Sequence, residues 1–535
     1  MKKVVCLLLA GLLGLTVLRA QAPFDVVLQP VQIAQLGGLQ SFAAGQANGK
    51  WLLIGGRLDG LHRRQPFASF DQAGHNNQLF VIDPENRQKW TAPLSSLPQA
   101  MQEQLRSTNM EFQQDGDLLY LIGGYGYSNS EGDHKTFHNL TVVDVPAVID
   151  AIIRGTSFSS YFRQITDPRF AVTGGNLTKL YDTWYLSGGQ RFDGRYNPMN
   201  GPSFTQTYTE AIRRFRISDN GTNITVQFLS EWNDAALLHR RDLNVVPQIM
   251  PNGEEGITMF SGVFQPTIDL PFLNAINIDS AGYAEQQGFS QYYNHYHSAI
   301  LPLYSAAENE MHTVFFGGIA QYYDSAGVLV QDNDVPFVKT VARVTRSADG
   351  SMAEYKMPLE MSGYIGASAE FIPLNSIPTF PNEVIKLDEL TGDTVLVGYI
   401  FGGINSSDKN IFWTNDGSQS SANSQLYAVY LVKDKSTGVH ELNPQSAADL
   451  RMQLSPNPTD GQLIITLNMA YVSDVNLLMT DVSGKKIMDE TIPAASFKPG
   501  KNYLDLSLPA IRAGSVLFVT VSTEKDKVVQ KLIVK

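Results

Sequence analysis

A short cassette, in which an aliphatic or aromatic run ends in Gly-Gly, recurs six times and limits the fold more than any other feature. Each copy follows a strand-like run and a turn, and a polar loop leads from it to another strand-like run. Short strands repeated in this way predict an all-β fold of equivalent sheets that bury their apolar faces against one another. The copies are LLIGGR (52–57), YLIGGY (120–125), YLSGGQ (185–190), MFSGVF (259–264), VFFGGI (314–319) and YIFGGI (399–404).

The cassettes are unevenly spaced, at intervals of 56 to 85 residues. In the fourth copy Ser261 stands where the others have the first glycine. Asn-Gly or Asp-Gly lies in several of the preceding turns, as tight hairpins require. Gly-Gly is a poor choice inside a strand, so we expect each pair to lie where the backbone turns tightly. The uneven spacing predicts equal sheets joined by loops of unequal length.

The cassette and its surroundings resemble the kelch repeat. A kelch blade has a hydrophobic strand, a turn, a strand ending in Gly-Gly, a loop, and a strand with an Asp turn and a later Trp. The first copy matches at Gly55-Gly56, Asp83 and Trp90, and the fifth at His297 and Gly317-Gly318. Other copies lack the Trp, and the spacing exceeds the usual kelch period of about 50 residues. The resemblance implies a six-bladed kelch-like β-propeller over residues 23–433.

One strand-like segment, FDVVLQPVQIAQ (24–35), has no cassette of its own. We expect it to pair with the last strand of the sixth blade, because this pairing closes the ring and leaves no exposed strand edge. A seventh blade within residues 319–390 is the alternative.

Residues 1–22 have the organisation of a secretory signal peptide. Two lysines precede an apolar run, and Ala20-Gln21-Ala22 supplies a small-residue cleavage site. The alternative is a membrane anchor, but the run is short for one. Cys6, the only cysteine, lies in this segment, so the mature chain is expected to have no disulfide and no thiol nucleophile. Removal of the apolar run with the signal peptide would also leave the mature chain without a transmembrane segment.

The C-terminal part of the chain forms a second module. Residues 434–450 have no apolar periodicity and are expected to be a linker, whereas residues 451–535 return to short strands typical of a small β-sandwich. This module resembles the type A C-terminal sorting domain of cargo of the Bacteroidetes type IX secretion system. The matching residues, taken as the sorting signal, include Pro456, Asn457, Pro458, Gly461, Gly484 and Lys535.

The sorting-domain resemblance implies export through the type IX secretion machinery. The protein would then be secreted or attached to the outer cell surface. The element before the penultimate strand, IRAGSVL (511–517), departs slightly from the usual Pro-Ala-Gly-Ile/Val-Tyr. An ordinary β-sandwich binding module is the alternative for residues 451–535.

The charge of the chain limits its partners. The net charge is −12 and no basic block offsets it, so no nucleic-acid partner is expected. The sequence contains no phosphate-binding loop, dinucleotide fingerprint or nucleophile elbow, and we expect no cofactor and no metal. His295 and His297 form an H-x-H pair on one predicted strand face, but no third ligand lies at a suitable spacing.

Candidate ligand-binding residues lie near the start of the strand that opens each repeat, because these strands should surround the central channel of a propeller. Arginines there favour an anionic or polyhydroxylated ligand. The alternative is that these side chains only connect neighbouring blades. The candidates are Glu111, Arg169, Arg241, Asp242, His295 and His297.

We expect a secreted or cell-surface binding protein for a glycan or an extracellular protein. The segments 126–138 and 191–210, rich in aromatic and amide side chains, are expected to be loops suited to such contacts. The resemblance to six-bladed kelch propellers also implies an enzyme alternative, a sialic acid mutarotase-like protein with its site in the channel. The copper-radical oxidases with this fold need a cysteine that the mature chain lacks.

Overall fold

The computed structural model describes residues 23–535 except 200, 326–327, 434–449, 470, 482–484, 510, 513 and 524–526. The predicted signal peptide and nearly all of the predicted linker therefore lie outside the described residues. Strands make up 53% of the chain and helices 8%, so the all-β prediction is confirmed. Among the described residues no helix is both long and apolar enough to span a membrane. The chain forms two compact units, Met1–Asp434 and Lys435–Lys535.

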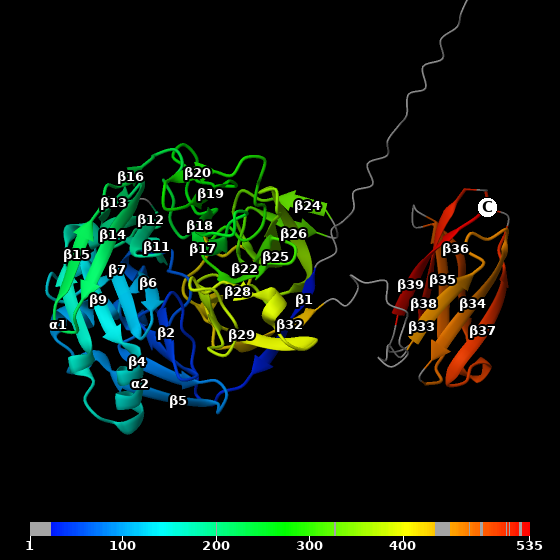
Figure 1. Cartoon of the computed structure of the whole chain (residues 1–535), viewed down its shortest axis with the longest axis horizontal. Coiled ribbons are helices and arrows are strands. Elements are labelled where there is room, and N and C mark those ends of the chain that lie inside the picture. Colours follow the sequence, from blue (N-terminus) through cyan, green and yellow to red (C-terminus); the bar gives the residue numbers. More distant parts are fainter. Residues whose placement is uncertain are drawn as a thin grey trace, which may run out of the picture. The chain divides into compact units, whose positions relative to one another are not determined.

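The first unit contains successive sets of antiparallel strands, and Figure 1 shows them following one another around it. The first half of the unit has three sets, each given from its innermost to its outermost strand. The sets are (β2 Ala43–Ala47, β3 Lys50–Ile54, β4 Gln78–Asp83, β5 Gln88–Pro93), (β6 Thr108–Asp115, β7 Leu118–Ser128, β9 Asn139–Asp144, β10 Phe162–Thr166) and (β11 Thr173–Leu180, β12 Thr183–Gly194, β14 Ala211–Asp219, β15 Ile224–Phe228).

The second half of the unit repeats this arrangement. Its fifth set carries one additional parallel strand, β28 (Ile385–Lys386), beside its innermost strand. The sets are (β17 Asn244–Ile249, β18 Glu255–Phe260, β19 Ala275–Ile278, β20 Tyr283–Glu285), (β21 Ala299–Ser305, β22 Glu310–Ile319, β25 Phe337–Arg346, β26 Met352–Glu360) and (β27 Ala369–Pro373, β29 Thr394–Gly402, β32 Leu426–Lys433, β1 Phe24–Val31).

Short elements decorate these sets. The segments 126–138 and 191–210, expected as loops, instead contain hairpin strands that extend β7 and β12. The remaining elements are α1 Gln99–Leu105, α2 Val145–Arg154, β8 Asp133–Thr136, β13 Phe204–Tyr208, β16 Trp232–Asn233, β23 Tyr322–Ser325, β24 Val328–Gln331, β30 Ile404–Ser406, β31 Ser420–Ala422, and the 3₁₀ turns η1 Pro66–Ala68, η2 Gln72–Gly74, η3 Leu94–Ser96, η4 Ser159–Tyr161, η5 Pro168–Phe170 and η6 Leu387–Glu389.

Each Gly-Gly cassette lies in or directly after the second strand of its set, where two successive residues have positive φ. In the fifth cassette Gly317 has φ +64° and Gly318 φ +95°. A Cβ atom on Gly317 would lie 2.1 Å from the carbonyl oxygen of Ile365, in the approach to the next set. Ser261 adopts φ +47° in the fourth cassette, and its hydroxyl donates a hydrogen bond to the carbonyl of Phe272 at 2.8 Å. The glycines therefore allow close approach between neighbouring sheets.

The N-terminal strand completes the last sheet, as the sequence predicts. β1 pairs antiparallel with β32 along its whole length, from Phe24 opposite Lys433 to Val31 opposite Leu426. Residues from the two ends of the unit thus share one sheet, and β32 has no open edge on that side.

Apolar side chains fill the spaces between successive sheets. One cluster joins the first set to the last, where Phe42 lies 5.8 Å from Phe401 and Trp51 lies 5.4 Å from Tyr399, ring centre to ring centre. Because the last set packs against the first, the arrangement is β-propeller-like.

The second unit is sandwich-like. Its strands alternate buried and exposed side chains, and the buried ones, among them Leu463, Ile465, Leu477 and Val519, form one core. One sheet contains β33 (Leu450–Ser455), β34 (Gln462–Met469) and β37 (Gly500–Ser507). The other contains β35 (Val475–Asp481), β36 (Lys486–Ile492), β38 (Val516–Ser522) and β39 (Lys527–Ile533), and η7 (Ala494–Ser496) is a short turn.

Candidate functional site

A ring of hydrogen bonds links the starts of the six innermost strands. In five of its links, a backbone N–H donates to the carbonyl of the preceding set at 2.7–3.2 Å. The remaining carbonyl, that of Asn109, accepts from the Thr173 hydroxyl at 3.1 Å. The ring therefore surrounds the axis of the first unit and fixes the spacing of the strand starts. Its members are Ser41, Asn109, Gly174, Asp242, His297 and Ser368.

The backbone of this ring is unusual. Asn109 has φ +53° and Asp242 φ +48°, and Ser41, Gly174 and Ser368 also have positive φ. Asn, Asp and Gly tolerate this region better than most residues. Such conformations persist only when the surrounding structure enforces them, and they concentrate at functional sites, so the ring marks the candidate site.

A cavity of about 210 Å³ lies along the axis, lined by residues of five innermost strands and by Ser41 and Phe42, which directly precede the sixth, β2. We call it the channel cavity. Four carboxylates and one imidazole line it, together with amide and apolar side chains. These ionisable residues are Glu111, Asp242, His297, Glu370 and Glu383.

Glu111 is the most distinctive group in the channel cavity. Its side chain extends from β6, the residue is 2% exposed, and its Oε1 accepts a hydrogen bond from the Gly175 N–H at 2.9 Å. Its Oε2 has no hydrogen-bond partner among the described residues. Burial, helped by the nearby charge of Asp242, raises the pKa of Glu111 to about 8. At neutral pH this carboxyl is therefore mainly protonated and can donate a hydrogen bond.

His297 and Glu370 form an ion pair in the same cavity. The His297 Nε2 lies 3.1 Å from the Glu370 Oε1. Burial opposes ionisation of His297, but the carboxylates of Glu370 and Asp242 outweigh it and raise the histidine pKa. The pair thus places a proton donor and a proton acceptor in the channel cavity that Glu111 also lines.

Asp242 connects the channel cavity to a second cavity of about 70 Å³, which we call the mouth cavity. Arg241 forms an ion pair with Asp242, and its Nε donates to the Tyr208 hydroxyl at 3.2 Å. Burial opposes the charge of Arg241, but Asp242 more than compensates and raises the arginine pKa. Asn109 also lines both cavities, and its amide donates to the Asp242 Oδ1 at 3.3 Å.

Five aromatic rings line the mouth cavity, together with polar side chains. His62 lies 5.0 Å from Tyr196, Phe70 lies 5.2 Å from Tyr125, and Phe192 lies 5.5 Å from Tyr196, measured between ring centres. Rigid aromatic walls beside an ion-paired arginine suit a ligand that has a flat apolar face with polar groups along its edge.

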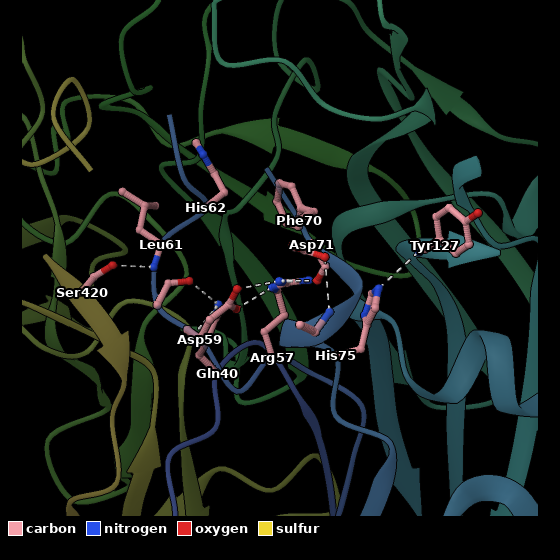
Figure 2. A network of polar contacts seen from close by, with 12 residues as sticks. Gln40, Arg57, Asp59, Leu61, His62, Phe70, Asp71, His75, Tyr127 and Ser420 are labelled. Atoms are coloured by element: carbon pink, nitrogen blue, oxygen red, sulfur yellow. Dashed lines mark hydrogen bonds and ion pairs between the residues drawn. The ribbon is translucent and has the colours of Figure 1, made fainter. Parts of the chain in front are cut away.

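The loop after the first cassette, residues 57–75, supplies His62 and Phe70 to this wall. Figure 2 shows Arg57 between Asp59 and Asp71, with its Nε 2.7 Å from the Asp59 Oδ1 and its Nη2 2.9 Å from the Asp71 carbonyl. These bonds close the loop on itself, so its two aromatic residues are held in place.

The same loop is tied to both neighbouring sets. Leu61 donates its N–H to the Ser420 hydroxyl at 3.0 Å on one side. On the other, the Tyr127 N–H donates to His75 Nε2 at 3.3 Å, so His75 Nδ1 donates to the Arg106 carbonyl at 3.1 Å. Burial lowers the pKa of His75 to about 3, which keeps the imidazole neutral.

A segment between β27 and β29 reaches the opposite end of the channel cavity. It contributes Glu383, and the adjacent Asn382 donates its amide to the Gln248 carbonyl at 3.0 Å. The segment also pairs β28 with β21. Residues far apart in the sequence thus line both ends of the channel.

Two of the predicted site residues do not join this constellation. Arg169 lies in η5, pairs with Asp167 at 2.6 Å and stacks 3.3 Å over Phe228 of an outermost strand, with its side chain 48% exposed. It lines neither cavity. Its position in a short turn before β11, rather than in the strand, explains the difference.

His295 also lies outside both cavities and is fully buried. The Gln321 N–H donates to its Nδ1 at 3.1 Å, and its Nε2 donates to the Gln291 carbonyl at 2.9 Å. Burial lowers its pKa to about 4. With both nitrogens engaged it is a structural residue. In the part of the chain that the structure describes, no group of three His, Asp or Glu is arranged to hold a metal ion.

Several residues of the site are not among those predicted from the sequence. The sixth innermost strand, β27, begins at Ala369 and presents Glu370 to the channel cavity. Glu370 follows the ring residue Ser368 by two positions, as Glu111 follows Asn109, so strand periodicity was the available signal. The aromatic residues His62, Phe70 and Tyr196 come from loops and carried no such signal.

The predicted sorting-signal residues pack against the C-terminal strand of the second unit. Asn457 accepts a hydrogen bond from the Ile533 N–H at 2.9 Å and donates to the Lys531 carbonyl at 2.7 Å. The Lys535 N–H donates to the Thr459 carbonyl at 2.7 Å, and the carbonyl of Gly461, which has φ +113°, accepts from Leu508. Gly484 lies outside the described residues.

Comparisons with solved structures give only distant similarities. The structure of YjhT is 12% identical with a TM-score of 0.39, and the match covers 78% of this chain and 99% of that one. Sucrose-6-phosphate hydrolase from Lactobacillus gasseri is 8% identical with a TM-score of 0.28, covering 96% and 86%. A family 43 arabinoxylan arabinofuranohydrolase from Bacillus subtilis is 10% identical with a TM-score of 0.26, covering 93% and 95%. No curated protein matches the chain.

A family match accounts for the second unit. Residues 453–535 match the secretion system C-terminal sorting domain. Such a domain implies interaction with the secretion machinery. Residues 453–535 are therefore a C-terminal sorting domain, and the protein is cargo of the type IX secretion system, exported to the cell surface or the extracellular space.

Proposed function

We propose that this protein is an exported glycan-binding protein whose ligand enters the channel of a six-bladed, kelch-like β-propeller. In this proposal residues 1–22 are a signal peptide, 23–433 the propeller, 434–450 a linker and 451–535 the sorting domain. The ring of hydrogen bonds, with one member from each of six strand sets, supports six blades. The pairing of β1 with β32 supports closure of the ring by the N-terminal strand.

The observation that carries the proposal is the chemistry of the channel cavity. Glu111 lines the cavity with one carboxyl oxygen that has no hydrogen-bond partner among the described residues, and Asp242 and Glu370 are each paired with a cation. Such a lining provides donors and acceptors with little net charge, which suits a polyhydroxylated ligand. The absence of Arg169 from the cavity removes one of the groups expected to bind a carboxylate.

A second candidate function is acid–base catalysis on a sugar, as in a sialic acid mutarotase-like enzyme. It is favoured by two groups in the channel cavity with raised pKa values, Glu111 at about 8 and His297. Groups with such values can exchange protons near neutral pH. Anomer exchange of reducing sugars, followed by NMR with and without the protein, tests this alternative. Exchange at the uncatalysed rate for every sugar would exclude it.

The binding proposal is tested with matched glutamate variants on a glycan array, followed by calorimetry with any glycan bound. Glu111→Gln keeps the size but replaces the group facing the cavity, and we expect affinity to fall by about ten-fold. Glu354→Gln is the control, because burial also raises the pKa of the partly exposed Glu354 to about 8, while among the described residues its carboxylate accepts from the backbone of Tyr292 and Tyr293 and lines neither cavity. Equal affinities for the two variants would contradict a channel site, and no binding by the unmodified protein would contradict glycan binding.

A further inference from the structure

An exposed patch lies beside the mouth cavity and is not part of the site described above. Trp413 is 61% exposed and Phe67 is 77% exposed, the largest exposed fractions of aromatic residues in the first unit's described part. Arg64 stacks on Trp413, and Arg195 bonds to the carbonyl of Phe67, which lies three residues after Arg64. Exposed apolar side chains grouped in one surface region mark interaction sites. We call Arg63, Arg64, Phe67, Arg195 and Trp413 the outer platform.

The outer platform is held rigidly. The Arg64 guanidinium lies 4.7 Å over the Trp413 ring, and the Arg64 N–H donates to the Asn415 carbonyl at 2.9 Å. The Asn415 amide in turn donates to the carbonyls of Leu61 and His62 at 2.8 and 3.1 Å. Since both loops are fixed before any ligand arrives, little ordering would accompany binding.

The outer platform is also cationic. Among the described residues none of its three arginines has a carboxylate within ion-pair distance, although the chain carries a net charge of −12. Among the described residues the Arg195 guanidinium donates to the Phe67 carbonyl, and Arg63 lies against Gly417. Guanidinium groups without a carboxylate partner are suited to bidentate binding of carboxylate or sulfate.

The platform continues directly from the mouth cavity. His62 lines the cavity, and Arg64, two residues further on, stacks on Trp413. The platform therefore begins in the loop that forms part of the mouth-cavity wall. A ligand chain that extends from the mouth along this loop meets an aromatic surface and three arginines that have no carboxylate partner among the described residues.

We propose that the protein binds an oligosaccharide chain, with one unit in the channel and an adjacent outer unit that carries a carboxylate or sulfate on the outer platform. This inference rests on the proposed function. It adds a second subsite and assigns its chemistry. Trp413 would stack on the apolar face of the outer unit, and Arg63 and Arg64 would bind its anionic group.

The test is a glycan array of matched pairs, each a neutral chain of two to four units and the same chain with an acidic outer unit, probed at 50 and 300 mM NaCl. The variants are Arg63→Gln/Arg64→Gln and Trp413→Ala. The control, Arg154→Gln/Arg216→Gln, removes the same charge from two exposed arginines elsewhere, paired with Asp150 and Asp182. Thermal melting of each variant checks that it is folded.

We expect the unmodified protein to bind the acidic member of a pair about ten-fold more tightly at low salt, and less so at high salt. Arg63→Gln/Arg64→Gln should lose this preference and keep the neutral affinity, and the control should keep both. Trp413→Ala should lower the affinity for chains by about ten-fold and leave the affinity for the single inner unit unchanged. An undiminished acidic preference in Arg63→Gln/Arg64→Gln, or equal binding of single units and chains, would overturn the platform alone. Absence of any glycan binding would overturn the channel proposal as well.

Discussion

At the scale of single residues, the cassette glycines and the ring residues share left-handed backbone but differ in purpose. The cassette glycines let sheets approach closely, as the 2.1 Å between a Cβ on Gly317 and the Ile365 carbonyl demonstrates. Ring residues such as Asn109 and Asp242 have polar side chains and line both cavities. Positive φ therefore serves packing between sheets at the cassette glycines and positions polar side chains of the candidate site at the ring residues.

Gly317→Val tests the first role. The substitution combines an unfavourable φ with a steric clash, so we expect a loss of at least about 3 kcal/mol of unfolding free energy, measured by urea denaturation. Gly132→Val separates the two effects, because Gly132 also has positive φ but no atom lies within 4 Å of its Cβ position. It should cost about 1 to 2 kcal/mol. Equal losses for both variants would show that close approach is not the reason for the glycine.

At the scale of elements, β1 has one face in the core between the fifth and sixth sets and one face outward. Phe24 is fully buried, 5.5 Å from the His312 ring, whereas Val27 is 39% exposed. Closure of the unit thus depends on a few side chains of one strand.

Phe24→Ala is expected to cost about 3 to 5 kcal/mol of unfolding free energy, because it leaves a cavity beside β32 and weakens the closing pair. Val27→Ala, in the same strand, should cost less than about 1 kcal/mol. Urea denaturation of both variants provides the measurement. A Phe24→Ala protein as stable as Val27→Ala would mean that β1 does not contribute to closure.

The elements also explain what the sequence could and could not predict. The cassettes located the second strand of every set, and the missing cassette in residues 24–35 identified the closing strand, since both follow from strand periodicity. Glu111, Asp242 and His297 could be predicted because each lies within three residues of the start of an innermost strand. Arg169 was misplaced because a 3₁₀ turn precedes its strand. The wall residues His62 and Tyr196 depend on loop conformation, which local pattern does not encode.

At the scale of the whole molecule, buried ionisable groups determine how stability depends on pH. Burial lowers the pKa of four histidines from 6.5 to between about 3 and 4, so the stability that they contribute is lost as pH falls below 6.5. The pKa of Glu111 and of Glu354 is raised from 4.5 to about 8, so their contribution is complete below 4.5 and is lost as pH rises to 8. The histidines are His62, His75, His295 and His312.

We therefore expect the unfolding free energy to be greatest near pH 6.5. Below pH 6.5 the unfolded chain binds up to four histidine protons that the folded protein does not, and these outweigh the two glutamate protons that only the folded protein binds. Above pH 6.5 the glutamates dominate. Each such proton changes the unfolding free energy by up to about 1.4 kcal/mol per pH unit. Urea unfolding between pH 4.5 and 9 gives the profile. Glu111→Gln should flatten the decline between pH 6.5 and 8, and an unchanged slope in that variant would contradict a protonated Glu111.

Export also belongs to the whole molecule. A chain ending at Lys433 keeps every strand of the first unit but lacks the sorting domain, so we expect it to remain in the periplasm of a type IX-competent host. Cell fractionation with a periplasmic marker measures this. The truncated chain in the medium without leakage of the marker would contradict the assignment.

The pairing of β1 with β32 has a consequence for the order of events during synthesis. The first strand of the unit to leave the ribosome is the last to find its partner, because roughly 400 residues separate the two. At 5 to 20 residues per second, that wait is about 20 to 80 s. Throughout it, the eight residues Phe24–Val31 have no strand to pair with, and Phe24 and Val26 have no core to enter. The delay favours passage through a first membrane in an open form, with the ring completed only on the far side.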